Sequence, residues 1–115
     1  KLSHDASPDG FTKSAANLGY YVQAAWYMDV CRSVGFEPKE FVFCAVEPNP
    51  PYMTGIYELD YSWLEFGRSE YRRALEIFDR LEYYQVPVFK DSRTGEILQT
   101  LSPPSWLFYR RNASY

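Results

Sequence analysis

Two polar side chains four residues apart, Gln23 and Tyr27, have a spacing that suits joint contact with a ligand. On a helix, this spacing places both side chains on one face. Tyr20 and Tyr21 lie close by, and the polar, aromatic surface that results suits a sugar–phosphate backbone or a stacked base. The simpler interpretation is that Gln23 points to solvent, because a buried amide must find hydrogen-bond partners.

Other catalytic arrangements find little support among the residues. His4 is the only histidine, and its polar segment is typical of a solvated loop rather than of a catalytic triad. Glycine-rich phosphate loops and the HExxH zinc pattern are absent. Asp5 and Asp9 flank an expected helix start, where acidic residues commonly act as caps or dipole partners. Cys31 and Cys44 fit neither a zinc pattern nor a disulfide framework, and we expect both to be reduced core residues.

The element that must position Gln23 and Tyr27 is a helix expected over residues 20–34. Ser7 as N-cap and Pro8 at the first helical position predict a short helix or turn before it. Within the longer helix, apolar side chains recur at four-residue spacing. They predict a buried stripe made of Val22, Ala25, Trp26 and Val30.

A hairpin and a long helix are expected next. The continuous apolar run at 41–46, FVFCAV, predicts a strand covered on both faces. Residues 52–59 predict a less buried antiparallel neighbour, and the intervening EPNPP predicts the turn. Asp60 is the expected N-cap of a helix that reaches about residue 84, because apolar side chains keep helical spacing along it.

The end of the chain has a weaker pattern. Residues 86–90 and 96–101 could pair across DSRTG as a second small hairpin, and SPPSW is expected to end regular structure. The order helix, strand, strand, helix and irregular tail predicts an α/β or α+β arrangement with a small sheet.

Composition limits the classes of function. A length of 115 residues favours one domain. The net charge of −3 argues against bulk attraction to polyanions, so any nucleic-acid site must be local.

No apolar run is long enough for a membrane span and no signal peptide is evident, which predicts a cytoplasmic protein. Aromatic residues make up 19% of the chain, more than so small a core needs, so we expect some to face a partner or a groove.

Several segments in order carry a resemblance to a known family. The chain resembles the catalytic domain of exodeoxyribonuclease VIII, the RecE-type exonucleases of phage and prophage origin in the PD-(D/E)XK nuclease superfamily. The resemblance implies that residues 1–115 are the C-terminal portion of one such exonuclease domain, with a partial restriction-endonuclease-like core. The matching strings are KLSHDASPDGF, NLGYYVQAAWYMD, FVFCAVEPNPPYMTGIYELD, GRSEYRRAL and TLSPPSW.

The resemblance assigns roles to individual residues. Lys1 stands where the family has its catalytic lysine, which orients the attacking water and stabilises charge at the scissile phosphate. Gln23 and Tyr27 match the family's Q-x-x-x-Y motif beside the active site. Four further residues are candidate DNA contacts, although charges on a helix surface are usually only solvated. They are Tyr20, Tyr21, Arg72 and Arg73.

The sequence also departs from the family pattern. Leu2 and Ser3 replace the usual pair of threonines after the lysine. The metal-binding carboxylates of the family lie upstream of that lysine, so the ligands of the expected Mg²⁺ are not predicted within this chain. Lys1 rather than Met begins the sequence, which suggests a piece of something longer. We therefore expect this chain alone to be inactive.

Two hypotheses follow. In the first, the parent protein is a Mg²⁺-dependent exodeoxyribonuclease that resects double-stranded DNA from its ends, 5′ to 3′, for phage-type recombination. The resemblance further implies a homo-oligomer that works with a single-strand annealing protein or recombinase. In the second, the chain is a non-catalytic DNA-binding or oligomerisation module left by truncation, and the aromatic surplus is its interface.

Overall fold

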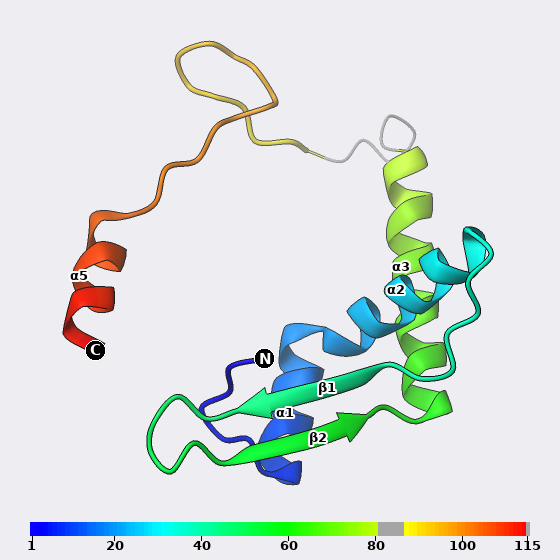
Figure 1. Ribbon diagram of the computed structural model, residues 1–115. Coiled ribbons are helices and arrows are strands. Elements are labelled where there is room, and N and C mark those ends of the chain that lie inside the picture. The colour runs from blue at the N-terminus through cyan, green and yellow to red at the C-terminus, as the bar shows by residue number, and fades with distance from the viewer. Residues whose placement is uncertain (81–86, 115) are drawn as a thin grey trace. The chain divides into compact units, whose positions relative to one another are not determined.

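The computed structural model describes residues 1–80 and 87–114. The chain divides into two compact units, Lys1–Arg80 and Leu81–Tyr115, and each is described by itself. In the first unit two helices are followed by an antiparallel hairpin and a third helix (Figure 1). The small α/β arrangement predicted from the sequence is confirmed for this unit.

Two consecutive helices begin the first unit. Helix α1 spans Pro8–Leu18, and the Ser7 hydroxyl caps it by accepting the Gly10 amide at 3.1 Å. Gly19 then adopts a left-handed conformation with φ of 71°, which ends α1 and lets the chain turn at once into α2, Tyr20–Ser33. The predicted cap and the predicted second helix are both confirmed.

The hairpin consists of β1, Val42–Val46, and β2, Thr54–Glu58. Its antiparallel register places Phe43 opposite Tyr57. The first residues of the chain extend this small sheet, because Leu2 forms a parallel bridge with Val46. Two 2.9 Å hydrogen bonds support the bridge, from the Ser3 amide to the Val46 carbonyl and from the Val46 amide to the Lys1 carbonyl. The segment that carries Lys1 is therefore fixed beside β1.

Strand β1 has one buried and one exposed face. Phe43 and Ala45 are buried, whereas Val42 and Cys44 are exposed. The prediction of a strand covered on both faces is wrong, because α1 and α2 cover only the face that carries Phe43, whose ring meets Phe11 and Tyr20. The prediction of Cys44 as a core residue is wrong for the same reason. Cys31 is half-buried, and both thiols are free.

The core combines small side chains with aromatic rings. Phe11 from α1 packs against Phe43, with ring centroids 5.5 Å apart, and against Tyr57 at 5.1 Å. Small residues let the helices and the hairpin approach closely enough for these rings to meet. The buried cluster is completed by Ala6, Ala15, Ala24 and Ala45.

The buried face of α2 differs from the predicted stripe. Ala24, Ala25 and Met28 are the buried residues of this helix. Trp26 and Val30, predicted to be buried, are 40% and 41% exposed. The difference arises because the neighbouring helix packs on the small residues, where the two backbones can come close, and leaves the bulky side chains at the rim.

Helix α3, Tyr61–Asp79, crosses α2 (Figure 1). The Asp60 carboxylate accepts the Trp63 amide at 2.9 Å, so the predicted N-cap is confirmed. Gly67 is buried at the crossing, where a Cβ atom would overlap the Tyr21 carbonyl oxygen. The predicted continuation of the helix to residue 84 lies outside the described residues.

The second unit does not contain the predicted hairpin. Residues 87–104 form no strand, and the chain turns at Asp91, whose amide donates to the Glu96 carbonyl at 2.9 Å. Helix α5 follows at Ser105–Ser114, where irregular structure was expected. The Leu107 amide donates to the Pro104 carbonyl at 3.0 Å, so the prolines precede a helix rather than end regular structure. Among the described helices, none is long and apolar enough to cross a membrane.

Replacing Gly67 by Ala should destabilise the first unit. The added methyl group would force α2 and α3 apart, and overpacking of this kind costs about 1–3 kcal/mol. Urea unfolding followed by circular dichroism measures the change. Ser69→Ala, at an exposed position of the same helix, is the control and should change the free energy of unfolding by less than about 0.5 kcal/mol. Equal stability of the Gly67→Ala variant would show that the helices are not in close contact.

Candidate functional site

The side chain of Lys1 lies over the ring of Tyr20. The Lys1 ammonium nitrogen is 4.5 Å from the ring centroid, a cation–π contact between the edge of the sheet and the first turn of α2. Tyr20 is itself held by Phe11 and Phe43, with ring centroids at 5.9 and 5.8 Å. The backbone of Lys1 is fixed by hydrogen bonds to β1, so both ends of this residue have defined positions.

Gln23 and Tyr27 follow Tyr20 along the same face of α2, at helical spacings of three and seven residues. The Tyr27 ring stacks on Phe41 at 6.1 Å and remains 48% exposed. Gln23 is a half-buried residue, and its amide makes no side-chain hydrogen bond to any residue that the structure describes. The expected pairing of these two residues on one helix face is present, next to the residue that Lys1 contacts.

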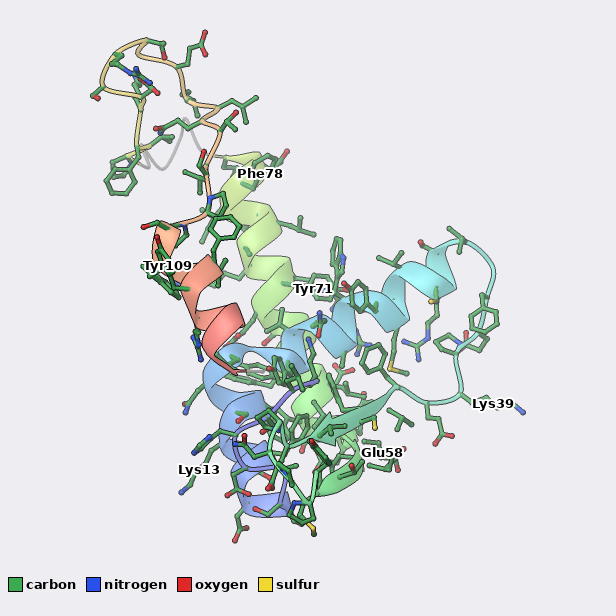
Figure 2. All side chains as sticks on the ribbon, turned by 60° about the vertical axis from the view of Figure 1, so that its left-hand side comes forward. Lys13, Lys39, Glu58, Tyr71, Phe78 and Tyr109 are labelled. Carbon is green, nitrogen blue, oxygen red and sulfur yellow. The ribbon has the colours of Figure 1, made fainter. Side chains whose placement is uncertain are left out.

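The same two residues line a groove of about 670 Å³ between α2 and the second half of α3. The Trp26 and Tyr71 rings meet in a T-shaped contact in this groove, with centroids 5.0 Å apart. In Figure 2, Tyr71 lies where α3 crosses α2, and Phe78 lies further along α3. The wall is mostly apolar, and its remaining residues are Gly19, Val22, Ala74 and Leu75.

Tyr21 takes part in a different contact from Gln23 and Tyr27. Its hydroxyl donates to the Glu70 carboxylate at 2.9 Å, and its ring stacks on Trp63 and Phe66 at 6.0 and 5.5 Å. The hydrogen bond to Glu70 is the main reason that the pKa of Tyr21 is raised. The structure therefore places Tyr21 in the α2–α3 packing, and its ring is not free to stack on a base.

The two arginines singled out in the sequence lie on α3, and both are exposed. Arg72 lines a second groove of about 360 Å³, together with Arg32, Arg68 and Asp29. Arg73 lines neither this groove nor the one that contains Gln23. Arg72 is thus the better placed of the pair for contact with a phosphate.

Asp29 organises the α2–α3 contact and was not anticipated from the sequence. Its carboxylate accepts two hydrogen bonds from the Arg68 guanidinium, at 2.7 and 2.8 Å, and one from Arg32 at 2.9 Å. The Tyr71 hydroxyl donates to the same carboxylate. These bonds, above all those from Arg68, hold the pKa of Asp29 far below its usual range. No local spacing could have revealed the pairing, because 39 residues separate Asp29 from Arg68.

Comparison with known families decides the superfamily. The family model described as "PDDEXK-like domain of unknown function (DUF3799)" matches residues 1–88. The chain belongs to this family. The likeness to PD-(D/E)XK nucleases seen in the sequence is confirmed at the level of a PDDEXK-like domain. No curated protein matches the chain.

The residues present do not make the metal centre that the nuclease superfamily implies. Among the described residues of this PDDEXK-like domain, no three His, Cys, Asp or Glu side chains gather in an arrangement able to hold a metal ion. The carboxylate of Asp29 is occupied by Arg68, Arg32 and Tyr71. No catalytic step through Mg²⁺ is therefore derived from these residues.

The Asp29 contact predicts a pH-dependent contribution to stability. The Asp29 carboxyl has a lower pKa folded than unfolded, so its contribution is complete above the unfolded value of about 4 and is lost as the pH falls through the folded value. Asp29→Asn should therefore lower the free energy of unfolding by about 2 kcal/mol at neutral pH. The difference from the unsubstituted chain should shrink below pH of about 4.

Urea unfolding of both chains across this pH range measures the effect. Glu40→Gln, at an exposed position outside the helices, is the matched control and should change stability by less than about 0.5 kcal/mol at neutral pH. A difference between Asp29→Asn and the unsubstituted chain that does not vary with pH would contradict the assigned ion pairs.

Proposed function

We propose that this chain is part of a Mg²⁺-dependent exodeoxyribonuclease of the RecE type, which degrades one strand of double-stranded DNA from its ends. Membership of a PDDEXK-like family supports a nuclease. The observation that carries the proposal is the position of Lys1, whose ammonium lies over Tyr20 at the start of the helix face that presents Gln23 and Tyr27.

Each of these residues has a role in the proposal. The Lys1 ammonium stabilises the negative charge that develops on the scissile phosphate and orients the attacking water. The contact with the Tyr20 ring limits where the ammonium can go, so that the charge is pre-positioned. In this proposal the Tyr20 ring positions the Lys1 ammonium and does not stack on a DNA base. Gln23 and Tyr27 are exposed enough to donate and accept hydrogen bonds at the substrate backbone.

The remaining elements of the proposal concern the ion, the substrate and the partners. The ion would be Mg²⁺, which would activate the attacking water, and it would need carboxylate ligands that the described residues do not supply. Arg72, which is exposed on α3, contacts a backbone phosphate. Arg73 is also exposed on α3 but is the less well placed of the two, because it lines neither groove. The resected strand is the 5′-terminated one, the product passes to a single-strand annealing protein, and the protein is a cytoplasmic homo-oligomer.

A non-catalytic module for DNA binding or oligomerisation is the second candidate. Two observations favour it: the described residues hold no metal-binding group, and large apolar side chains such as Phe78 are exposed. An exposed apolar surface of this kind is typical of an interface. This candidate requires that the complete natural protein have no carboxylates that could form a metal site. The mass and the sequence of that protein test this requirement.

Cleavage by a longer polypeptide that continues upstream of Lys1 tests the first candidate. Such a protein should degrade linear duplex DNA in Mg²⁺ and not in EDTA, as followed by release of acid-soluble nucleotides. Lys1→Ala should reduce the rate about a hundredfold or more, because the charge that stabilises the transition state is removed. The Lys1 side chain is exposed and does not belong to the buried core cluster, so the fold should survive the substitution.

Lys13→Ala is the matched control, since Lys13 is an exposed lysine on α1 (Figure 2). Its rate should equal that of the unsubstituted protein. If the longer protein leaves duplex DNA intact, the nuclease proposal fails. If it cleaves and Lys1→Ala cleaves equally fast, the proposal loses its central residue.

A further inference from the structure

The groove between α2 and α3 has properties that the catalytic roles of Gln23 and Tyr27 do not use. Aromatic side chains come from both helices, with Trp26 and Tyr27 on α2 and Tyr71 and Phe78 on α3. Their exposures are substantial, 40% for Trp26 and 73% for Phe78. A volume of about 670 Å³ lies within the range of sites that hold small organic groups.

The aromatic walls are held in place by contacts with one another and with neighbouring residues. Tyr71 donates its hydroxyl to Asp29 and meets the Trp26 ring at 5.0 Å, so both rings are anchored to the ion-pair network. Tyr27 is supported from behind by Phe41. A ligand that stacks here therefore orders few side chains, which lowers the entropic cost of binding.

The Gln23 amide favours a ligand with hydrogen-bonding groups over an apolar partner surface as the occupant of the groove. Gln23 lines the groove as a half-buried residue, and its amide makes no side-chain hydrogen bond within the described part of the chain. A purely apolar partner surface would cover this amide without pairing it, at a cost of about 1–3 kcal/mol. A nucleobase has a flat face that can stack on the aromatic rings. Its edge carries hydrogen-bond donors and acceptors that can pair with the Gln23 amide. It therefore matches both the aromatic and the polar residues of the groove.

An arginine directly follows a residue of the groove wall in the sequence. Arg72 follows Tyr71 on α3, is exposed, and makes no ion pair or hydrogen bond with any described residue. Arg72 itself lines the second groove, together with Arg68 and Arg32, which are both engaged by Asp29. Arg72 is thus available to an anionic group on a ligand whose ring occupies the aromatic groove.

We propose that the groove between α2 and α3 binds unpaired nucleotides of single-stranded DNA. The base stacks against the aromatic wall that includes Trp26, its edge pairs with the Gln23 amide, and the neighbouring phosphate contacts Arg72. The inference rests on the proposed function, because a nuclease that resects duplex ends must hold an unpaired strand. It adds Trp26 and Phe78 to the residues that contact DNA, and it assigns the Gln23 amide to the edge of a base rather than to the backbone.

Binding of a fluorescein-labelled oligothymidylate of about ten nucleotides tests the inference. Anisotropy titrations use the 115-residue chain at low salt in EDTA, so that no cleavage interferes. Loss of one stacking ring weakens binding of a single strand by about five- to hundredfold. Trp26→Ala should show a loss in this range, and Phe78→Ala should also weaken binding. Circular dichroism confirms that each variant is folded.

Three controls define the outcome. Phe36→Ala removes an exposed aromatic residue that lines neither groove and should leave affinity unchanged. An abasic strand of equal length should bind as weakly to the unsubstituted chain as oligothymidylate binds to Trp26→Ala. Sedimentation velocity without DNA identifies the competing occupant. A dimer that Trp26→Ala and Phe78→Ala both dissociate would show that a second copy fills the groove, and would overturn the inference.

Failure of this inference is distinguishable from failure of the nuclease proposal. Unchanged oligothymidylate affinity in both variants, equal binding of the abasic strand, or no binding at all would overturn the groove assignment. None of these results depends on Mg²⁺ or on Lys1. Conversely, loss of cleavage in Lys1→Ala does not bear on whether Trp26 stacks on a base.

Discussion

The contact between α2 and α3 is the constraint on which the rest of the first unit depends. Asp29 receives hydrogen bonds from Arg68, Arg32 and Tyr71, and Gly67 lets the two backbones approach. Because a charged network has directional requirements that apolar packing lacks, it sets the rotation of α2 about its axis. That rotation decides which side of α2 faces the groove and which faces β1. The site therefore depends on residues that take no part in its chemistry.

The aromatic surplus is divided between three tasks. Phe11 and Phe43 fill the core between α1 and the hairpin. Tyr20 joins that core to Lys1, so one ring serves both packing and the positioning of a charge. Trp26 and Phe78 stay exposed at the groove, which explains why so small a chain carries more rings than its core can bury.

Local signals were sufficient for part of the fold and of the site. The caps at Ser7 and Asp60 and the hairpin could be predicted, because capping and turn formation depend on neighbouring residues. The exposure of Cys44 could not, because an apolar run does not reveal which face of a strand is covered. Gln23 and Tyr27 could be paired by helical spacing. The ion pairs of Asp29 could not, because they join distant parts of the chain.

One measurement tests most directly whether the face carrying Lys1, Gln23 and Tyr27 meets DNA. A duplex with a short single-stranded overhang is titrated into the isotope-labelled chain without Mg²⁺, and amide, side-chain amide and indole resonances are followed by NMR. The account predicts that the largest shifts fall on Gln23, Tyr27, the Trp26 indole and the residues next to Lys1. Shifts confined to α1, or none at saturating DNA, would contradict it.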